Sequence, residues 1–591
     1  MIRNLPLLAL LSVLLSVSGL SAAPIKLGKR HVDESNGFKF QPPAKWDQVP
    51  TKFKEVTVVG KWVAGRAKRG FYAAQLQVLR FLKARARSED ERAKPPVGGP
   101  QGIPGYAGLF QGQPKDVFEY IKRTFRFQKF DIIEDDTDFR MKRKNLAVHL
   151  RVYHARIPKG MPGRNIAKGQ TMIVAAQVVS RDESDSTYGI LFICTVADAK
   201  DMLKPFKTCI RRFRILEPGE EDEEDQVSDA DLFVDSESKP AVWRNVRKAK
   251  LIPGWEARDT QNYLLIYNKQ VKKSLIKTIA KHIEAIRAQV YEQLFPPARE
   301  VKAISVVRVC KDKAEYHKYG GPGGSAGYWS PGDEELVFYQ DKRNKKDSLR
   351  VLYHEAFHQY IHYAVGKVAP HSWFNEGHGD YFAGHNYKGR NFVADVFRWR
   401  TGIISNAIAR KSYVPLKEFL TYTQGQYYAN PGLCYAQGWS LVYFLREVER
   451  RKIKKYKQYW GLLDRYFAKI KANVKLVKEK GLYGLEDPPE EEKKEKEKEG
   501  EGFGEAAEPA EPESKLTKVP GIDKPFPGEH PGAGAAPEPE KIDTTTETKT
   551  VAGPQITGIK SGLDAAVADV FGKIDLEQLE KHWIEFIKKH G

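Results

Sequence analysis

The sequence contains few cysteines. Four occur among 591 residues, which is too few for a scaffold held together by disulfides. Cys194 and Cys209 lie near each other in the sequence and could pair in an oxidising compartment. The alternative, in which these two and also Cys310 and Cys434 are buried free thiols, fits the sequence equally well. The cysteine content therefore excludes a disulfide-rich protein and leaves the pairing open.

Long apolar runs are missing beyond the N-terminus. Residues 5–17 form a short apolar run after a single Arg, and small residues follow as far as Ala23. This order is typical of a cleaved secretory signal, which we predict at residues 1–23. The run is short for a membrane span, and an uncleaved anchor is the alternative. We expect a secreted or periplasmic protein with no transmembrane segment after signal cleavage.

Positive charge is not gathered into one stripe, although the formal net charge is +21. Lys and Arg alternate with acidic residues along the chain. Such a surface favours anionic partners, including lipid headgroups, acidic wall polymers and nucleic acid. Dispersed charge is more often just a solvated face. We therefore expect no specific nucleic-acid site and keep an anionic surface or polymer as a candidate partner.

The chain is long enough for two or three domains. Residues 30–216 alternate strand-like and helical patterns, from "GFKFQPPAKW" through "YGILFICTV" to "RRFRIL", which predicts an α+β domain. The opening and closing segments resemble PsbP-like α/β/α sandwich domains in their pattern. Residues 217–240 begin with an acidic stretch that has no apolar periodicity, so we interpret them as a linker.

The second half contains a further domain, at residues 241–483. Its predicted elements include a helix at 272–295 and strands at 303–310 and 336–340. The glycine-rich segment between these strands lacks the Lys-Ser/Thr ending of a phosphate-binding loop and opens a strand, which indicates a hairpin.

The C-terminal part changes composition twice. Residues 484–557 are rich in Pro, Gly, Glu and Lys, which predicts a disordered low-complexity insertion. Residues 558–591 regain a helical pattern behind a candidate cap at Asp575, with Trp583 and Phe586 on the apolar face. An apolar helix face must pack on something, so we expect this C-terminal helix to dock on the preceding domain.

The segment "YHEAFHQYIHY", residues 353–363, places His354 and His358 one helical turn apart with Glu355 between them. Apolar residues at helical spacing predict a helix that ends near Gly366. Positions four apart lie on one face of a helix, so both imidazoles can bind one ion. Neutral imidazole suits zinc, and the neighbouring carboxylate can take a proton from an attacking water.

A catalytic zinc normally has three protein ligands and one water, so a third ligand is expected. The segment "WFNEGHGDYFAG" offers Glu376, and Asp380 lies one turn further on the same face, where it could hydrogen-bond a ligand imidazole. The sequence therefore predicts one Zn2+ per chain, bound by His354, His358 and Glu376. The other histidines near these motifs are expected to be surface or supporting residues, because the ligand set is complete: His362, His371, His378 and His385.

The two motifs together resemble the gluzincin metallopeptidases, a clan that includes thermolysin-like and aminopeptidase-N-like enzymes. "HEAFH" and "WFNEGHGDYF" carry the resemblance, the second being close to the clan's Trp-Leu-x-Glu-Gly pattern. It implies the same three ligands, with Glu355 as the general base. Residues 241–483 also resemble an uncharacterised family of secreted bacterial proteins with predicted peptidase-like domains, partly through "YAQGWSLVYFL" at residues 435–445.

The sequence departs from the clan in two places. One residue fewer separates His358 from Glu376 than is usual in the aminopeptidases, so we expect a tighter loop. The Gly-x-Met-Glu-Asn motif that grips a free amino terminus is missing, and "GGSAGYW" stands in its region. This difference counts against exopeptidase activity. In the clan, the strand before the metal helix pairs with an extended substrate, and residues 336–340 are predicted to do so here.

A Tyr or His donor commonly stabilises the oxyanion in this clan, and Tyr435 is our first candidate. Tyr422, Tyr427 and Tyr428 precede it in "TYTQGQYYANPGLCY" and are alternatives. Aromatic residues on a core helix more often pack than catalyse.

We therefore expect an α+β protein. An N-terminal α/β/α sandwich-like domain would precede a mainly helical zincin-type metallopeptidase domain with a small mixed β-sheet. The expected function is a secreted zinc-dependent endopeptidase that acts on a peptide or protein substrate. The alternatives are a non-catalytic exported binding protein with a structural or vestigial zinc domain, and a polyanion-binding wall protein. The intact Glu355 favours the enzyme, because a structural zinc site needs no general base.

Overall fold

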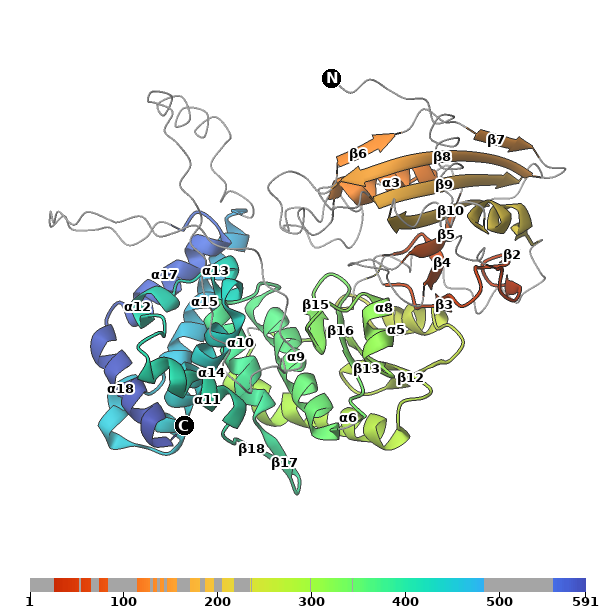
Figure 1. The fold of residues 1–591 in the computed structure, drawn as a ribbon. Helices are drawn as coiled ribbons and strands as arrows, with labels where there is room; N and C mark the ends of the chain where they lie inside the picture. The colour runs from red at the N-terminus through yellow and green to blue at the C-terminus, as the bar shows by residue number, and fades with distance from the viewer. Residues whose placement is uncertain are drawn as a thin grey trace, which may run out of the picture. The chain divides into compact units, whose positions relative to one another are not determined.

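The computed structural model describes residues 26–52, 55–64, 74–82, 114–127, 131–134, 139–142, 146–156, 171–180, 186–195, 205–216, 234, 236–297, 299–342, 344–482 and 556–590. The predicted signal, most of the predicted linker and nearly all of the predicted insertion lie outside the described residues. Helices and sheets are both abundant, which confirms the α+β class (Figure 1).

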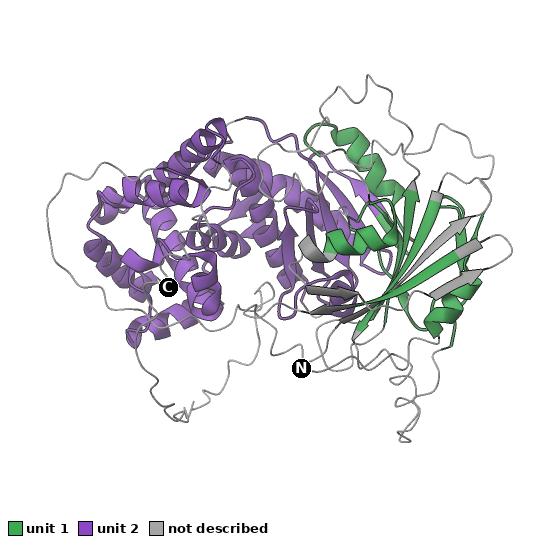
Figure 2. Cartoon of the chain, turned by 90° about the horizontal axis from the view of Figure 1, so that it is seen from above, with its two compact units in different colours: residues 1–99, 109–256 green, residues 100–108, 257–591 purple. Residues whose placement is uncertain are grey.

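The chain divides into two compact units (Figure 2). The first contains residues 1–99 and 109–256, and the second contains residues 100–108 and 257–591. This division differs from the predicted start of the second domain at residue 241, because helix α5 (Pro240–Ala249) belongs to the first unit.

The first unit is built on an eight-stranded sheet whose strands all pair antiparallel. Its order is β3-β4-β5-β10-β9-β8-β6, and β7 also pairs with β8. The strands are β3 (Asp47–Gln48), β4 (Val58–Val63), β5 (Gln75–Leu82), β6 (Asp131–Glu134), β7 (Phe139–Lys142), β8 (Leu146–Arg156), β9 (Thr171–Ser180) and β10 (Ser186–Thr195). A smaller sheet joins β1 (His31–Asp33), β2 (Phe38–Phe40) and β11 (Arg214–Ile215).

Helices pack on both faces of the large sheet. Successive side chains of a strand point to opposite faces, and along β10 Ile190 and Phe192 join one apolar cluster while Leu191 joins another. Helix α3 (Val117–Phe127) contributes to the second cluster, and the helical residues 205–212 contribute to the first. Cys194 and Cys209 are both buried in the first cluster and are not joined by a disulfide bond.

The second unit contains a five-stranded mixed sheet in the order β12-β13-β14-β16-β15. Its strands are β12 (Trp255–Asp259), β13 (Tyr263–Asn268), β14 (Ser305–Cys310), β15 (Gly327–Ser330) and β16 (Glu335–Tyr339). Strands β13, β14 and β16 run parallel, while β15 is antiparallel to β16. The strands predicted at 303–310 and 336–340 are therefore confirmed, and the hairpin predicted in the glycine-rich segment is formed by β15 and β16.

The helix predicted at 272–295 is interrupted. Helix α6 (Lys273–Ile286) is followed by a π-helical turn at Arg287–Tyr291 and by the short α7 (Glu292–Leu294). The turn directs the buried Arg287 guanidinium toward the Glu292 carboxylate and the Val301 carbonyl, each 2.9 Å away. The apolar pattern continues through the turn, so periodicity did not reveal the break.

Most of the second unit is helical. Helix α10 (Ser372–Ala383) packs on α14 (Pro431–Arg450), and α9 (Lys345–Val365) packs on α10 and on strands β15 and β16. The remaining elements are α8 (Lys313–Tyr319), α11 (Arg398–Ala409), α12 (Leu416–Phe419), α13 (Gln424–Ala429), α15 (Leu462–Glu479), a 3-10 helix at Lys454–Tyr459, and the hairpin of β17 (Asn386–Lys388) and β18 (Asn391–Val393). In the described part of the chain, no helix is long and apolar enough to cross a membrane.

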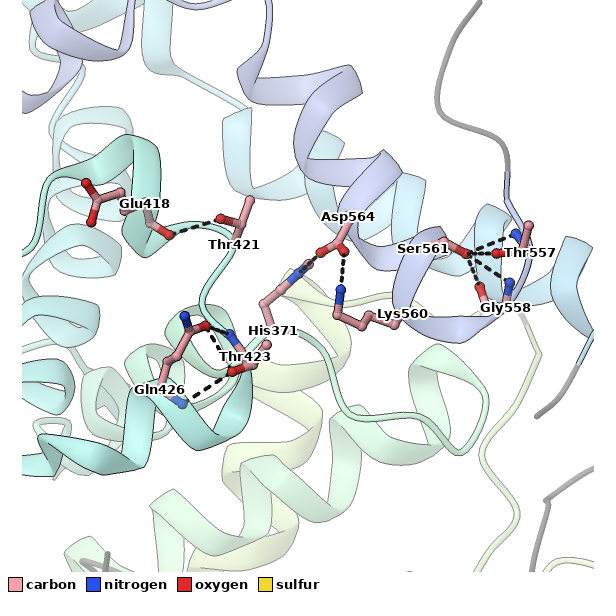
Figure 3. A network of polar contacts seen from close by, with 10 residues as sticks. All are labelled: His371, Glu418, Thr421, Thr423, Gln426, Thr557, Gly558, Lys560, Ser561 and Asp564. Carbon is pink, nitrogen blue, oxygen red and sulfur yellow. Dashed lines mark hydrogen bonds and ion pairs between the residues drawn. The ribbon is translucent and has the colours of Figure 1, made fainter. Parts of the chain in front are cut away.

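The C-terminal segment forms two helices, α17 (Ile559–Phe571) and α18 (Leu576–His590), where one was predicted. The Asp575 carboxylate caps α18 by accepting a hydrogen bond from the Gln578 backbone. Helix α17 packs on α15, and α18 packs on α11, α12 and α14. Figure 3 shows Asp564 of α17 bonded to His371, the residue that precedes α10. The C-terminal helices are therefore part of the core of the second unit.

Candidate metal centre

Helix α9 carries the first two predicted ligands in its middle. Asn344 caps the helix by accepting a hydrogen bond from the Lys346 backbone at 3.0 Å, and Gly366 ends it with a φ of 105° that suits glycine. His354 and His358 are both buried, with ring centroids 4.6 Å apart. The predicted helix, its end and its shared histidine face are confirmed.

Glu376 of α10 reaches the same point. Its Oε2 lies 3.1 Å from His354 Nε2 and 3.2 Å from His358 Nε2. One ligand atom from each of the three side chains lies within 4.8 Å of the others, and all three residues are buried. Among the residues that the structure describes, this is the one group of three or more His, Cys, Asp or Glu side chains so arranged.

Two glycines let α10 approach its neighbours closely enough to place Glu376. A Cβ at Gly379 would lie 2.8 Å from His354 Nδ1, and a Cβ at Gly377 would lie 2.6 Å from the Gly438 carbonyl oxygen on α14. Both distances are too short for a larger residue. The glycines around the third ligand in "NEGHGD" therefore serve helix packing.

The outer nitrogen of each ligand imidazole also faces an oxygen. His354 Nδ1 lies 3.2 Å from Asp380 Oδ1, and His358 Nδ1 lies 3.0 Å from Asn375 Oδ1. A partner on Nδ1 fixes the orientation of the ring and leaves Nε2 for a metal. Asp380 thus lies where the sequence predicted. Asn375 was missed, although its position directly before Glu376 was a signal that could have found it.

Sequence reasoning also missed Arg400 on α11. Its side chain is fully buried, and its Nε donates to Asp380 Oδ2 at 2.6 Å. The guanidinium carbon lies 4.2 Å from the Trp399 ring centroid and 4.9 Å from that of Tyr435. The cation compensates the buried Asp380 charge and holds the carboxylate beside His354.

The carboxylates around His354 and His358 favour a positive charge at this position. Burial by itself would lower the pKa of His354, but hydrogen bonding to Asp380 and Glu376 outweighs burial and raises it to about 10. Burial would raise the pKa of Glu376, but the two histidines hold it well below its usual value. Two imidazole nitrogens and one carboxylate oxygen are a donor set that zinc prefers. These residues fit a zinc ion.

Two tyrosines flank the three ligands. Tyr428 of α13 donates its hydroxyl hydrogen to Glu376 Oε1 at 2.7 Å. The Tyr435 ring on α14 stacks near His354, with centroids 6.3 Å apart, and its buried oxygen has no hydrogen-bond partner of normal geometry. Tyr427 is fully buried and Tyr422 packs against Phe419. Tyr428 therefore donates to one of the candidate ligands, while Tyr435 contacts His354 through its ring.

Glu355 is buried but lies outside the group of three ligands. Its Oε2 has no hydrogen-bond partner. A Cβ on Gly327 of β15 would lie 3.2 Å from Glu355 Cγ, so this strand passes directly over the residue. A buried carboxylate oxygen without a hydrogen-bond partner is costly in a folded protein and calls for a functional explanation.

The prediction that residues 336–340 pair with a substrate is wrong. This strand is β16, and both of its edges are occupied, one by β14 and the other by β15. The backbone groups needed for strand addition are therefore used within the sheet. Strand β15 lies at the edge.

The remaining histidines near the motifs have other partners. His371 contacts the Tyr466 hydroxyl and Asp564, His378 Nδ1 contacts the Phe374 carbonyl, and His385 Nδ1 contacts the Tyr381 carbonyl. His362 packs near Trp329, with ring centroids 6.0 Å apart. None of them belongs to the group of metal-ligating atoms found in the described residues.

Known proteins show little similarity to this chain. No family model matches the chain, and no curated protein matches it. Among solved structures, the chain is similar to cyanobacterial PsbP from Synechocystis at 12% identity and a TM-score of 0.22, covering 34% of this chain and 97% of that one. It is similar to the Ran-binding protein Mog1p of Saccharomyces cerevisiae at 10% identity and a TM-score of 0.20, covering 33% and 97%. Scores this low carry no argument about fold or function.

Proposed function

We propose that this protein is a secreted zinc-dependent metallopeptidase that cleaves internal peptide bonds. One observation carries the proposal: Nε2 of His354, Nε2 of His358 and a carboxylate oxygen of Glu376 converge, while Glu355 on the same helix offers a buried carboxylate oxygen without a partner. The three ligands would hold the zinc. Zinc in such a site supplies Lewis-acid chemistry that activates water and polarises a carbonyl group.

The chain's own residues would handle the protons. Glu355 would accept a proton from the attacking water and pass it to the leaving amine, because it follows His354 directly on α9 and one of its carboxylate oxygens is buried without a partner. Asp380 and Asn375 would keep the imidazoles oriented. Tyr435, whose ring lies beside that of His354, would donate its hydroxyl hydrogen to the oxyanion of the substrate.

The edge of the sheet suggests how a peptide would bind. Strand β15 leaves one side unpaired within the described sheet and passes beside Glu355 at Gly327. An extended peptide can add to such an edge through main-chain hydrogen bonds. We propose β15 in place of β16 as the strand that positions the scissile bond.

The proposal includes the finer architecture. We interpret the second unit as a zincin-type domain, supported by the mixed sheet beside α9 and by a third ligand on the next long helix. We interpret the first unit as an α/β/α sandwich, supported by helices on both faces of its sheet.

The deciding experiment replaces Glu355 with Gln. Glu355→Gln keeps the size of the side chain but removes its ability to accept a proton, so zinc content should be unchanged and peptide cleavage should fall by about 10² to 10⁴. Glu418→Gln, the same change at an exposed site on α12, is the matched control. The proposal fails if zinc-loaded wild type cleaves nothing in a broad peptide and protein screen, or if Glu355→Gln cleaves as fast as wild type.

A further inference from the structure

The two oxygens of Glu376 have different surroundings. Oε2 faces both ligand histidines, at 3.1 and 3.2 Å, while Oε1 accepts the hydrogen bond of Tyr428 at 2.7 Å. The whole side chain is buried, so water does not compete freely for either oxygen. The carboxylate therefore offers one oxygen to the metal position and has the other oxygen bound to the protein.

Tyr428 is held where it must be to make this bond. It sits near the end of α13, whose start is fixed by a capping box in which Thr423 and Gln426 bond each other's backbone (Figure 3). Its ring meets the buried Tyr427 edge to face, with centroids 5.8 Å apart, and packs beside Tyr435 at 6.2 Å. The phenol is thus positioned by packing on both sides.

A glutamate ligand needs such a restraint. Rotation about its last torsion angle has a broad energy minimum, and a carboxylate can bind a metal through one oxygen or through both. A catalytic zinc site has three protein ligands and one water and can expand to five ligands during the reaction. A second bound oxygen would fill this fifth position beside the water and raise the coordination number from four to five. A hydrogen bond from a neutral hydroxyl to a carboxylate is strong enough to oppose that rotation.

We propose that Tyr428 is a positioning residue that restricts Glu376 to one-oxygen coordination and so keeps a coordination position open at the metal. The inference rests on the proposed function, since it assumes that the three ligands bind a metal. It assigns Tyr428 a role distinct from that of Tyr435, which faces His354 and is not hydrogen-bonded to a ligand.

Cobalt(II) in place of zinc tests the inference, because its visible absorption is strong in four-coordinate sites and weaker in five-coordinate ones. Tyr428→Phe removes one oxygen atom and should convert a four-coordinate spectrum into a weaker, higher-coordinate one. The zinc dissociation constant, measured by chelator competition, should rise about 10-fold to 100-fold. Tyr427→Phe is the matched control, because this neighbour on α13 has a buried hydroxyl without a hydrogen-bond partner. It should leave both readouts unchanged.

The outcomes separate the two proposals. If wild type, Tyr427→Phe and Tyr428→Phe all bind cobalt with the same spectrum, the metal site stands and the role of Tyr428 is refuted. If wild type binds neither cobalt nor zinc, the proposed function and this inference both fail. Circular dichroism checks folding, and Tyr428→Trp, which retains a ring with an N–H donor, is the second variant if Tyr428→Phe is unfolded. If the cobalt spectrum of Tyr428→Trp equals that of wild type, the role of the hydrogen bond is supported. If Tyr428→Trp shows the weaker spectrum although it retains a donor, that role is contradicted.

Discussion

Trp583 anchors the C-terminal helix α18 to the unit that holds the candidate metal centre. Its side chain is 0% exposed, its ring meets Tyr413 edge to face at 5.6 Å, and its Nε1 donates to Ser440 Oγ of α14 at 3.1 Å. Trp583→Ala removes the indole and leaves a cavity, which typically costs about 3–5 kcal/mol. We expect the free energy of unfolding of the second unit to fall by about 4 kcal/mol.

Hydrogen exchange measured peptide by peptide is the appropriate assay, because it reports α14 separately from the N-terminal unit. At 1.4 kcal/mol per factor of ten, a loss of about 4 kcal/mol raises the population of open forms by on the order of 10³. The slowest amides of α14 exchange through such openings. Their exchange should therefore accelerate by a comparable factor in Trp583→Ala.

Lys581→Ala is the control, because Lys581 is exposed on the same helix and surface substitutions change stability by about 0.5 kcal/mol or less. Equal exchange rates of α14 in Trp583→Ala and Lys581→Ala would refute the reasoning. That result would mean that α18 contributes no stability to the unit, whatever its packing in the structure.

Two further predictions concern the buried charges. Asp380→Asn removes the carboxylate beside His354 and leaves the Arg400 cation uncompensated, so the zinc dissociation constant should rise about 10-fold to 100-fold. The control is Asp395→Asn, the same change at an exposed residue. Equal zinc affinities of the two variants would contradict the role of Asp380. Burial lowers the pKa of His385 to about 4, below the unfolded value of 6.5. The unfolded chain therefore binds a proton that the folded chain excludes, and stability falls as the pH drops from 6.5 to 4. At 1.36 kcal/mol per pH unit, the loss in the free energy of unfolding amounts to about 3 kcal/mol. Denaturant titrations between pH 6.5 and pH 4 should show that this free energy falls less steeply in His385→Gln than in wild type.

The local sequence pattern was sufficient to place the two candidate ligands of α9 on one face of the helix. The spacing of His354 and His358 decides that they share a face, since every α-helix advances by the same angle per residue. Gly366 marked the end of α9 because a left-handed residue there favours glycine. Such features depend on neighbours a few positions apart, and a sequence displays them directly.

Strand order depended on distant segments. The alternation of apolar residues identified β14 and β16 as strands, but nothing in residues 336–340 shows that β15 would cover the remaining edge of β16. Backbone pairing uses groups that every residue has, so a strand's sequence carries little information about which strand lies next to it. This is why residues 336–340 were wrongly predicted to have an edge free for a substrate.

The sequence by itself identified the three candidate ligands, the general-base candidate and the apolar face of α18. Only the tertiary structure decided which side chains support the triad, because these come from other elements. Arg400 arrives from α11 and Tyr428 from α13, brought beside Asp380 and Glu376 by helix packing. A single hydrogen bond across such a sequence distance leaves no periodic trace, since its geometry exists only after the core has assembled around it.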